Sequence, residues 1–397
     1  MSSSSPTSDA RASRSRIIAL AAMICSAAAV GAGISLGLPL LSLVLASRGV
    51  SGSLIGLNTA MAGIASLAVI PFVTPLATRI GAARLLLTAL LTTGVSFYGF
   101  HLVDNFWGWF PLRLVFHGGL TIAFVMSEFW INSLSPPGKR GLIMGIYATI
   151  LSLGFTIGPA VLALVGSQGG LPFAIGALIL ICAALPVIFA LHETPDLESG
   201  PSRSVLAFVF GAPVATLAAL TFGAIEAGGM AILPIYGLRL GLNEAIAAQF
   251  VSAVALGNLV MQIPIGLMSD KIDRRDMLLV CAIIGVIGAL ILPAVAPDFW
   301  PTAIVLFFWG GVVAGLYTIG LTYLGANYSG ANLASANAAF VMMYSIGMLI
   351  GPPAIGVGLD AFASTHSPHG APLVMAGFFG FYLLVLLIEK VRRKRNG

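Results

Sequence analysis

Long apolar runs separated by short polar segments dominate this chain. A helix that crosses the hydrocarbon core of a bilayer needs about 20 predominantly apolar residues. By this criterion we expect twelve membrane-spanning helices, at residues 17–45, 54–77, 84–102, 107–130, 140–166, 171–191, 205–237, 246–268, 275–296, 301–326, 334–359 and 372–391. The seventh run is long, and Pro213 marks the point where we expect an interfacial stretch to end and the span to begin.

The composition supports a membrane protein. Hydrophobic residues make up 58% of the chain and charged residues only 8%, whereas a soluble domain is about 25% charged. So few charges cannot cover a soluble surface of this size. The three cysteines, Cys25, Cys182 and Cys281, lie in apolar runs without the spacing of a disulfide framework or a metal site, and we interpret them as packing residues.

Positive charges are concentrated on one side of the predicted membrane. Twelve spans place both termini on that side, together with sixteen of the nineteen Lys and Arg residues. Only Arg48 and Arg239 fall in the opposite loops, and Arg113 falls within a span. Cytoplasmic loops carry an excess of Lys and Arg, so we expect both termini in the cytoplasm. The net charge of +5 therefore requires no nucleic-acid partner.

Polar segments define the expected domains. Residues 1–16 are Ser-rich, and we expect a disordered cytoplasmic tail there. Residues 192–204, with the sequence HETPDLESGPSRS, form a cytoplasmic linker between two groups of six spans. The predicted domains are thus a bundle at 17–191 and a bundle at 205–391, followed by a basic tail at 392–397.

The two predicted bundles share landmarks at a nearly constant offset. The motif Gly154-xxx-Gly158-Pro159 in the fifth span recurs as Gly347-xxx-Gly351-Pro352 in the eleventh, 193 residues later (347 − 154). A polar loop at 266–275 has a fainter counterpart at 76–84, with 192 residues between Thr78 and Asp270 (270 − 78). Paired glycines let helices approach closely, which suits either packing or a hinge. A membrane protein built from two similar halves indicates a transporter.

The loop at 266–275 resembles the signature G-x-L-a-D-r-x-G-r-R of the major facilitator superfamily. The matching residues are Gly266, Asp270, Arg274 and Arg275; Lys271 keeps the basic charge, whereas Met268 and Asp273 depart from the pattern. In the first copy Leu76, Arg79 and Gly81 match, but Thr78 stands where the family usually has Asp. The glycine motif of the fifth span resembles the antiporter-type signature of the same superfamily.

A narrower resemblance comes from the fourth and fifth spans. The run Glu128-Phe129-Trp130-Ile131-Asn132, followed by Arg140-Gly141, Met144-Gly145 and Tyr147, is similar to the YcaD-like branch, a bacterial inner-membrane group without a defined substrate. The resemblance implies an all-α integral membrane protein of twelve transmembrane helices in two six-helix pseudo-repeated bundles. It also implies secondary transport by alternating access, with substrate bound near mid-membrane between the halves.

The repeated loop supplies a candidate cytoplasmic gate. A carboxylate such as Asp270 can accept hydrogen bonds from the N-terminus of a neighbouring helix or pair with Arg274 or Arg275. Because Thr78 has no charge, we expect the weaker latch in the first half; the alternative is a solvated topology loop. The candidate gate residues are Thr78, Arg79, Gly81, Glu128, Gly266, Asp270, Lys271, Arg274 and Arg275. The candidate packing or hinge residues are Gly154, Gly158, Pro159, Gly347, Gly351 and Pro352.

Ionisable residues within spans are costly in lipid and mark functional sites. Arg113 and His117 lie one helical turn apart, and Arg113 could meet an anionic substrate group or snorkel to the outer headgroups. His117 could relay protons or be structural. Glu226 lies near the middle of the seventh span without a cation nearby in sequence, which suits proton coupling, although a permanently paired structural Glu is the alternative.

Polar and aromatic residues at mid-depth are expected to complete the substrate and proton pathway. These are Asn258, Gln262, Tyr147, Tyr317, Tyr323, Asn337 and Tyr344, and each could instead serve helix packing. Together they describe an amphipathic pocket, and the shortage of cavity cations argues against a highly phosphorylated substrate. Export of an amphipathic compound is therefore our leading hypothesis, with metabolite uptake, lipid translocation or a non-transporting receptor as alternatives.

Enzyme function finds no support in the sequence. No Gly-rich phosphate loop precedes a helix, and no His, Cys or carboxylate cluster has metal-ligand spacing. We therefore expect no metal and no cofactor, with a proton gradient as the energy source. The expected partners are a small-molecule substrate and membrane lipids, for a monomer in the bacterial inner membrane.

Overall fold

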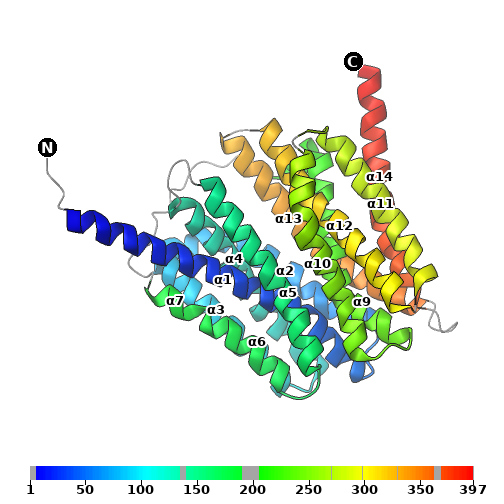
Figure 1. The fold of residues 1–397 in the computed structure, drawn as a ribbon, viewed down its shortest axis with the longest axis horizontal. Coiled ribbons are helices and arrows are strands. Elements are labelled where there is room, and N and C mark those ends of the chain that lie inside the picture. Colours follow the sequence, from blue (N-terminus) through cyan, green and yellow to red (C-terminus); the bar gives the residue numbers. More distant parts are fainter. Residues whose placement is uncertain are drawn as a thin grey trace. The chain divides into compact units, whose positions relative to one another are not determined.

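The chain folds into helices throughout the part that the computed structural model describes. That part comprises residues 6–134, 140–189, 205–269, 271–296, 298–328, 330–361 and 368–396. Within these ranges every element of secondary structure is a helix (Figure 1). The expected all-α class is thus confirmed, whereas the expected linker at 192–204 and Asp270 lie outside the described residues.

The helices follow the order of the expected spans. The first half contains α1 (Pro6–Ser47), α2 (Gly52–Ile80), α3 (Ala82–Leu102), the 3-10 helix η1 (Phe106–Gly108), α4 (Trp109–Leu134), α5 (Arg140–Val165), α6 (Leu171–Cys182) and α7 (Ala184–Phe189). The second half contains α8 (Val205–Gly211), α9 (Pro213–Arg239), α10 (Glu244–Ser269), α11 (Arg274–Val295), α12 (Phe299–Asn327), α13 (Gly330–Ala361) and α14 (Gly370–Asn396). Among the described residues, 11 helices are long and apolar enough to span a membrane, and Thr149–Val165 of α5 is a shorter apolar helix.

Three helix boundaries refine the expected ones. The long seventh run is divided as predicted, because α8 ends at Gly211 and α9 begins at Pro213, where proline has no N–H to leave unsatisfied. The sixth span is interrupted at Ala183, between α6 and α7. Helix α1 begins at Pro6 and not at residue 17, because an established helix propagates more easily than it nucleates. Part of the segment expected to be disordered is therefore helical.

Contacts between residues divide the chain into two compact units. Unit 1 comprises Met1–Gly37, Ala68–Val161 and Gln168–Glu198, and unit 2 comprises Leu38–Leu67, Leu162–Ser167 and Ser199–Gly397. The sequence predicted a single boundary between the two domains, at the linker. The segments 38–67 and 162–167 instead pack with the second half of the chain. Unit 2 thus contains the first part of α2 as well as α8 to α14.

Glycines bring α1 and α5 into backbone contact in unit 1. A Cβ on Gly154 would overlap the carbonyl oxygen of Ala28, and one on Gly158 would overlap the backbone nitrogen of Leu36. The hydroxyl of Ser35 donates a hydrogen bond of 3.4 Å to the carbonyl of Gly154. The first copy of the glycine motif is therefore a site of close packing.

The second copy of the motif makes the equivalent contact in unit 2. A Cβ on Gly347 of α13 would overlap the carbonyl oxygen of Leu220 of α9, and one on Gly351 would overlap that of Ala224. Ala28 and Leu220, the partners of Gly154 and Gly347, are themselves 192 residues apart (220 − 28). The internal repeat thus preserves a contact as well as a motif. Pro159 and Pro352, which follow the two motifs, are both buried.

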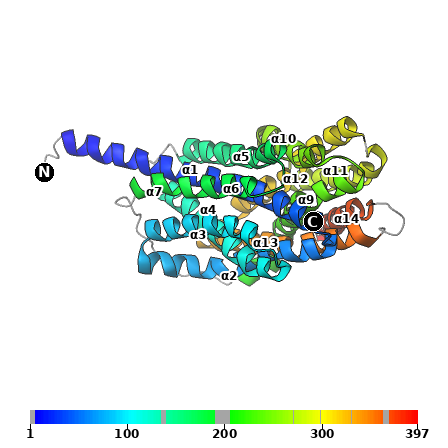
Figure 2. The same cartoon turned by 90° about the horizontal axis from the view of Figure 1, so that it is seen from below.

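The remaining helices of unit 2 pack as neighbours around α9 and α12. Helix α10 packs against α12, and α11 packs against both α12 and α14. Helices α11 and α14 lie side by side in both views (Figures 1 and 2). Large apolar side chains such as Phe210 and Ile263 remain 80% and 71% exposed. Exposed apolar side chains of this size suit contact with lipid and not with water.

Candidate functional site

The most central charged residue of unit 2 is Glu226. It lies thirteen residues from each end of the span Pro213–Arg239 (226 − 213 and 239 − 226). The other Asp, Glu, Lys and Arg residues described in unit 2 lie within three residues of the end of a span or outside the spans. The hydroxyl of Tyr344 donates a hydrogen bond of 2.6 Å to Oε2 of Glu226. The structure thus joins two predicted pathway residues, Glu226 of α9 and Tyr344 of α13, in one site.

A glycine and four aromatic rings build the surroundings of this pair. A Cβ on Gly223 would overlap the carbonyl oxygen of Tyr344, so glycine permits α13 to approach α9 at this level. The ring of Phe222, one turn before Glu226, stacks on Tyr344 with centroids 5.8 Å apart. Tyr317 of α12 contacts Phe222, Tyr344 and Phe340 with centroid separations of 5.3, 6.2 and 5.2 Å. We call Glu226, Phe222, Tyr317, Phe340 and Tyr344 the acidic aromatic site.

A chain of polar side chains joins α10 to α12 beside Tyr317. The Nε2 amide of Gln262 donates to Oδ1 of Asn258 over 2.8 Å, and the hydroxyl of Thr318 donates to Oε1 of Gln262 over 2.6 Å. Asn258, Gln262 and Thr318 are all partly exposed. Asn258 and Gln262 were expected in the pathway, whereas Thr318 was missed because a threonine in an apolar helix carries no distinctive sequence signal. These neutral groups can bind a ligand by hydrogen bonds without adding charge.

The predicted pathway residues of unit 1 are more deeply buried. Arg113 and His117 are 0% and 3% exposed, and Nη1 of Arg113 lies 3.5 Å from Nε2 of His117. Tyr147 of α5 is also buried. The one-turn pairing of Arg113 and His117 on α4 agrees with the expected shared face. Neither side chain presents an open surface to a ligand in this conformation.

Two predicted pathway residues lie away from these clusters. Arg275 of α11 donates a hydrogen bond to the hydroxyl of Tyr323, and its guanidinium carbon lies 5.0 Å from the centre of the Tyr323 ring. Tyr323 therefore contacts the predicted gate and not the acidic aromatic site. Asn337 is exposed on α13, whereas Tyr344, seven residues later, is only partly exposed.

The second gate loop contains an N-terminal helix cap. The carboxylate of Asp273 accepts hydrogen bonds from the backbone N–H groups of Arg275 and Asp276, and so caps the N-terminus of α11. This explains why Asp is favourable at the position where the family signature has glycine. Lys271 is exposed and Arg274 is partly buried. Gly266 has open space where a Cβ would stand. Asp270 lies outside the described residues, so its pairing stays a prediction.

The first gate loop is almost entirely helical, because α2 continues to Ile80 and α3 begins at Ala82. The hydroxyl of Thr78 donates to the carbonyl of Pro75 over 2.9 Å, and Arg79 is exposed. Gly81 has a φ of 89°, in the left-handed region that a side chain disfavours, and it links α2 to α3. Glu128, the remaining gate candidate, is partly buried on α4.

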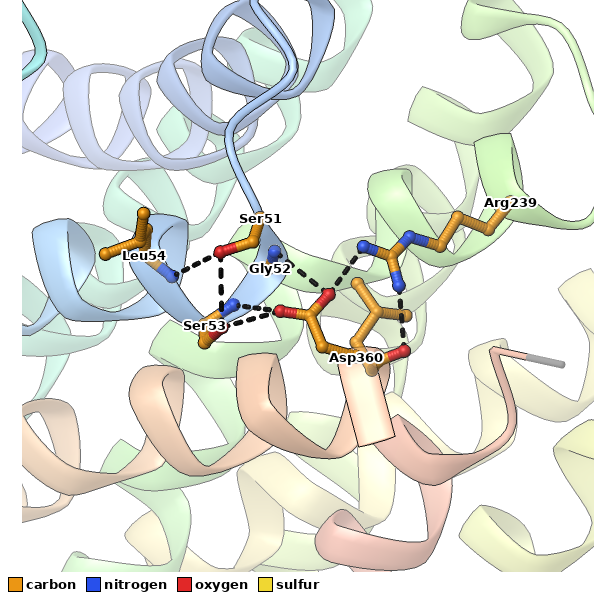
Figure 3. Close-up of polar contacts among 7 residues, drawn as sticks. Ser51, Gly52, Ser53, Leu54, Arg239 and Asp360 are labelled. Atoms are coloured by element: carbon orange, nitrogen blue, oxygen red, sulfur yellow. Dashed lines mark hydrogen bonds and ion pairs between the residues drawn. The ribbon is translucent and has the colours of Figure 1, made fainter. Parts of the chain in front are cut away.

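A further polar cluster joins three helices of unit 2, and the sequence analysis did not foresee it. The carboxylate of Asp360, at the end of α13, accepts hydrogen bonds from the backbone of Gly52 and Ser53 and from the guanidinium of Arg239 (Figure 3). The sequence pattern identifies Arg239 only as a loop charge and gives no role to Asp360. The available signal was that two opposite charges end the seventh and eleventh spans on the side poor in charge.

The profile of the Major Facilitator Superfamily matches residues 23–259 and 217–397, two overlapping stretches that together cover most of the chain. The chain belongs to the Major Facilitator Superfamily. It is a multi-pass membrane protein with a transporter fold, and its relatives are transporters and not enzymes.

Two bacterial relatives illustrate the similarity in sequence. The chain is 28% identical over 336 residues to YfkF of Bacillus subtilis (strain 168), covering 83% of this chain and 85% of that protein. It is 24% identical over 329 residues to YcaD of Escherichia fergusonii, covering 80% of this chain and 81% of that protein. Both are described as uncharacterised MFS-type transporters. The predicted resemblance to the YcaD-like branch is thus confirmed.

Solved structures show the same fold at low sequence identity. The nucleoside transporter NupG matches with a TM-score of 0.74 and 13% identity, over 94% of this chain and 98% of that one. A bacterial homologue of the human lysosomal transporter Spinster, in an inward-facing and unoccupied conformation, matches with a TM-score of 0.73 and 15% identity, over 97% and 96% of the two chains. At this identity the similarity establishes the fold alone.

Proposed function

We propose that this chain is a proton-coupled secondary transporter that exports amphipathic organic cations, with Glu226 as the group that binds either the proton or the cation. The observation that carries the proposal is the position of Glu226 at the centre of its span. An acidic side chain at that depth is costly in lipid, and it is kept where it serves a pathway.

The surroundings of Glu226 favour an organic cation over other ligands. A cation is attracted to the face of an aromatic ring as well as to a carboxylate. Four rings lie in the acidic aromatic site, and the described part of unit 2 places no Lys or Arg at the middle of a span. A metal ion would instead require several hard oxygen ligands. The partly exposed amides of Asn258 and Gln262 suit the polar groups of an amphipathic molecule.

Competition between a proton and the organic cation for the carboxylate of Glu226 couples proton entry to cation export. Ionised Glu226 binds a cation, whereas protonated Glu226 has no net charge and releases it. A proton that enters from the outer side therefore displaces the cation, and its departure to the cytoplasm restores the binding form. Each cycle thus exchanges one proton for one cation, without a net chemical change in the protein.

The binding part of the proposal is tested with two ions of almost the same shape and opposite charge. Tetraphenylphosphonium and tetraphenylborate are titrated into the purified protein by calorimetry. We expect tetraphenylphosphonium to bind at least about tenfold more tightly, and Glu226→Gln to abolish most of that preference. Equal binding of the two ions would exclude the cation as the substrate class, while leaving transport of another substrate open.

The transport part is tested in vesicles with a pH gradient. We expect ethidium flux to follow the gradient in the parent protein and to lose that dependence in Glu226→Gln. The matched control is Glu389→Gln, the same substitution in a partly exposed residue near the end of α14. Full pH dependence in Glu226→Gln would contradict the coupling role, and binding without flux would favour a receptor. Metabolite uptake or lipid translocation would be indicated by hits of those classes in a ligand-stabilisation screen.

The cellular setting is part of the proposal. The relatives YfkF and YcaD come from bacteria, and the excess of Lys and Arg on the side of the termini supports a bacterial inner-membrane protein with both termini in the cytoplasm. A single chain contains the twelve expected spans, so we expect a monomer to be the functional unit.

A further inference from the structure

Asp360 makes four hydrogen bonds at the end of α13. Oδ1 accepts from the backbone N–H of Gly52 over 3.1 Å and from Nη2 of Arg239 over 2.6 Å. Oδ2 accepts from the backbone N–H of Ser53 over 2.7 Å and from its hydroxyl over 2.6 Å. Bonds in which one partner is charged are roughly twice as strong as neutral ones. One carboxylate thus joins α2, α9 and α13 (Figure 3).

The contact satisfies groups that each helix would otherwise leave unpaired. The first N–H groups of a helix lack an intrahelical acceptor, and the N-terminus attracts negative charge. At the start of α2, Ser51 accepts from Leu54 through its side chain, and Asp360 takes the N–H groups of Gly52 and Ser53. Arg239 also donates over 2.8 Å to the carbonyl of Leu359, in the last turn of α13, where a cation is favourable.

Backbone packing below the carboxylate extends the same contact. A Cβ on Gly56 of α2 would overlap the carbonyl oxygen of Pro352, and one on Gly356 of α13 would overlap that of Gly52. A Cβ on Gly63 would lie 2.6 Å from the carbonyl oxygen of Ser345. Helices α2 and α13 therefore approach each other closely at Gly56, Gly63 and Gly356.

A second carboxylate makes the contact that the internal repeat relates to the contact of Asp360. Glu244, the first residue of α10, accepts a hydrogen bond of 2.6 Å from the backbone N–H of Ser167, just after α5. Ser167 stands 193 residues before Asp360 (360 − 167), and Ser51 stands 193 residues before Glu244 (244 − 51). In each case one carboxylate links the beginning of one helix to the end of another. The acid belongs to the helix that ends there in the first contact, and to the helix that begins there in the second.

We propose that Asp360 is an outer latch of the transport cycle: its carboxylate holds the start of α2 against the ends of α9 and α13 while the predicted outer side is closed. Glu244 and Ser167 form the weaker second contact. Because α2 belongs to the first six spans and α9 and α13 to the second six, an outward opening has to break these bonds. The latch acts on the side opposite the predicted cytoplasmic gate, and it does not depend on which substrate or ion the protein uses.

The test measures access to a buried position beneath the latch. Ala62 of α2 is 0% exposed and packs with Ala227 and Met348. It lies ten residues from Gly52, about 15 Å deeper along the helix. Ala62→Cys is introduced into a full-length chain in which Cys25, Cys182 and Cys281 are replaced by alanine. Intact cells are then treated with a membrane-impermeant cationic methanethiosulfonate, and the labelling rate is measured.

We expect Asp360→Asn to raise the labelling rate at least about tenfold, because an amide keeps the shape but loses the charge-assisted bonds. Arg239→Gln should raise the labelling rate less, since Asp360 still accepts the hydrogen bonds from the start of α2. Glu244→Gln alone should also raise the labelling rate slightly. In the double variant with Asp360→Asn, the labelling rate should be higher than with Asp360→Asn alone. The matched control is Asp276→Asn, which breaks the exposed pair of Lys390 and Asp276 at 2.8 Å. An exposed pair of this kind contributes little, so no change is expected.

The outcomes separate a latch from general destabilisation. A labelling rate for Asp360→Asn within about twofold of the parent would overturn the proposal, and so would an equal increase in Asp276→Asn. If Asp360→Asn does not accumulate in the membrane, Ser53→Ala carries the test, because it removes only one of the four bonds. No increase in Ser53→Ala and Arg239→Gln would then refute the latch.

Discussion

At the scale of single residues, the proposed binding of a cation depends on a few polar side chains that lie against aromatic rings. Tyr317 is the ring that contacts each of the other three in the acidic aromatic site. Its hydroxyl is not needed for an attraction between a cation and the ring face. The ring and the carboxylate of Glu226 therefore make separable contributions to binding.

Replacing Tyr317 by leucine tests the contribution of the ring. Leucine keeps apolar contact but removes the π system, so we expect the Kd of tetraphenylphosphonium to rise about three- to thirty-fold. The control is Tyr328→Leu, which removes a ring packed against Phe208 at 5.3 Å beyond the end of the span. Titration calorimetry on both variants provides the measurement. An equal loss in the two variants would assign the effect to stability and not to the site.

Residue identity was the part of the site most accessible from sequence. Glu226 was singled out because a carboxylate within an apolar run is rare, and Asn258 and Gln262 because they lie one turn apart. Of the four aromatic rings, Tyr317 and Tyr344 were predicted from their polar hydroxyls, whereas Phe222 and Phe340 were not, because they look like packing residues in any apolar helix. The contact of Tyr323 with Arg275 could not be predicted, since helical periodicity cannot show that a residue of another helix reaches it.

At the scale of helices, glycine positions determine how closely neighbours approach. Both copies of the glycine motif bring two backbones into contact, α5 with α1 and α13 with α9. Paired small residues are a general means of packing helices in membranes. The motif could be read from the sequence, whereas its partner helices could not, because the spacing of glycines along one helix does not identify the helix that fills the gap.

Filling one of these contacts should destabilise the protein. In Gly347→Ala the new Cβ would overlap the carbonyl oxygen of Leu220, and overpacking of a rigid contact costs about 1–3 kcal/mol. We expect a Tm lower by several degrees in a detergent melting assay. The matched control is Gly380→Ala on α14, where a Cβ meets nothing within 4 Å. An unchanged Tm in Gly347→Ala would show that α9 and α13 can separate freely.

At the scale of the whole molecule, hydrophobic run lengths predicted the class and the order of helices, because the bilayer sets the length of a span. The contact units were not predictable in this way. The sequence places α2 with the first six spans, but contacts place its residues up to Leu67 with the second half of the chain. Backbone contacts of Gly56 and Gly63 with α13 agree with that assignment, and the sequence alone does not reveal them.

The orientation in the membrane is a prediction at this scale. The distribution of Lys and Arg favours cytoplasmic termini. Green fluorescent protein fused after Gly397 should fluoresce, and alkaline phosphatase fused there should be inactive. Fusions after Asn243, in the loop between α9 and α10, should show the opposite pattern. Fluorescence at Asn243 with phosphatase activity at Gly397 would invert the topology and would place the Asp360 cluster on the cytoplasmic side.

The two carboxylate contacts that the internal repeat relates to each other bear on how the two halves of the chain diverged. An ancestor of six helices, assembled as a pair of identical chains, would have made this contact twice in the same form. Fusion of two such genes would leave each copy free to change separately. In this chain one position is Asp360 of α13, whose carboxylate contacts α2 and α9, while its counterpart is Ser167, which donates a backbone N–H to Glu244. The two halves of the chain thus share the place of a contact, while the helix that carries the acid differs between them.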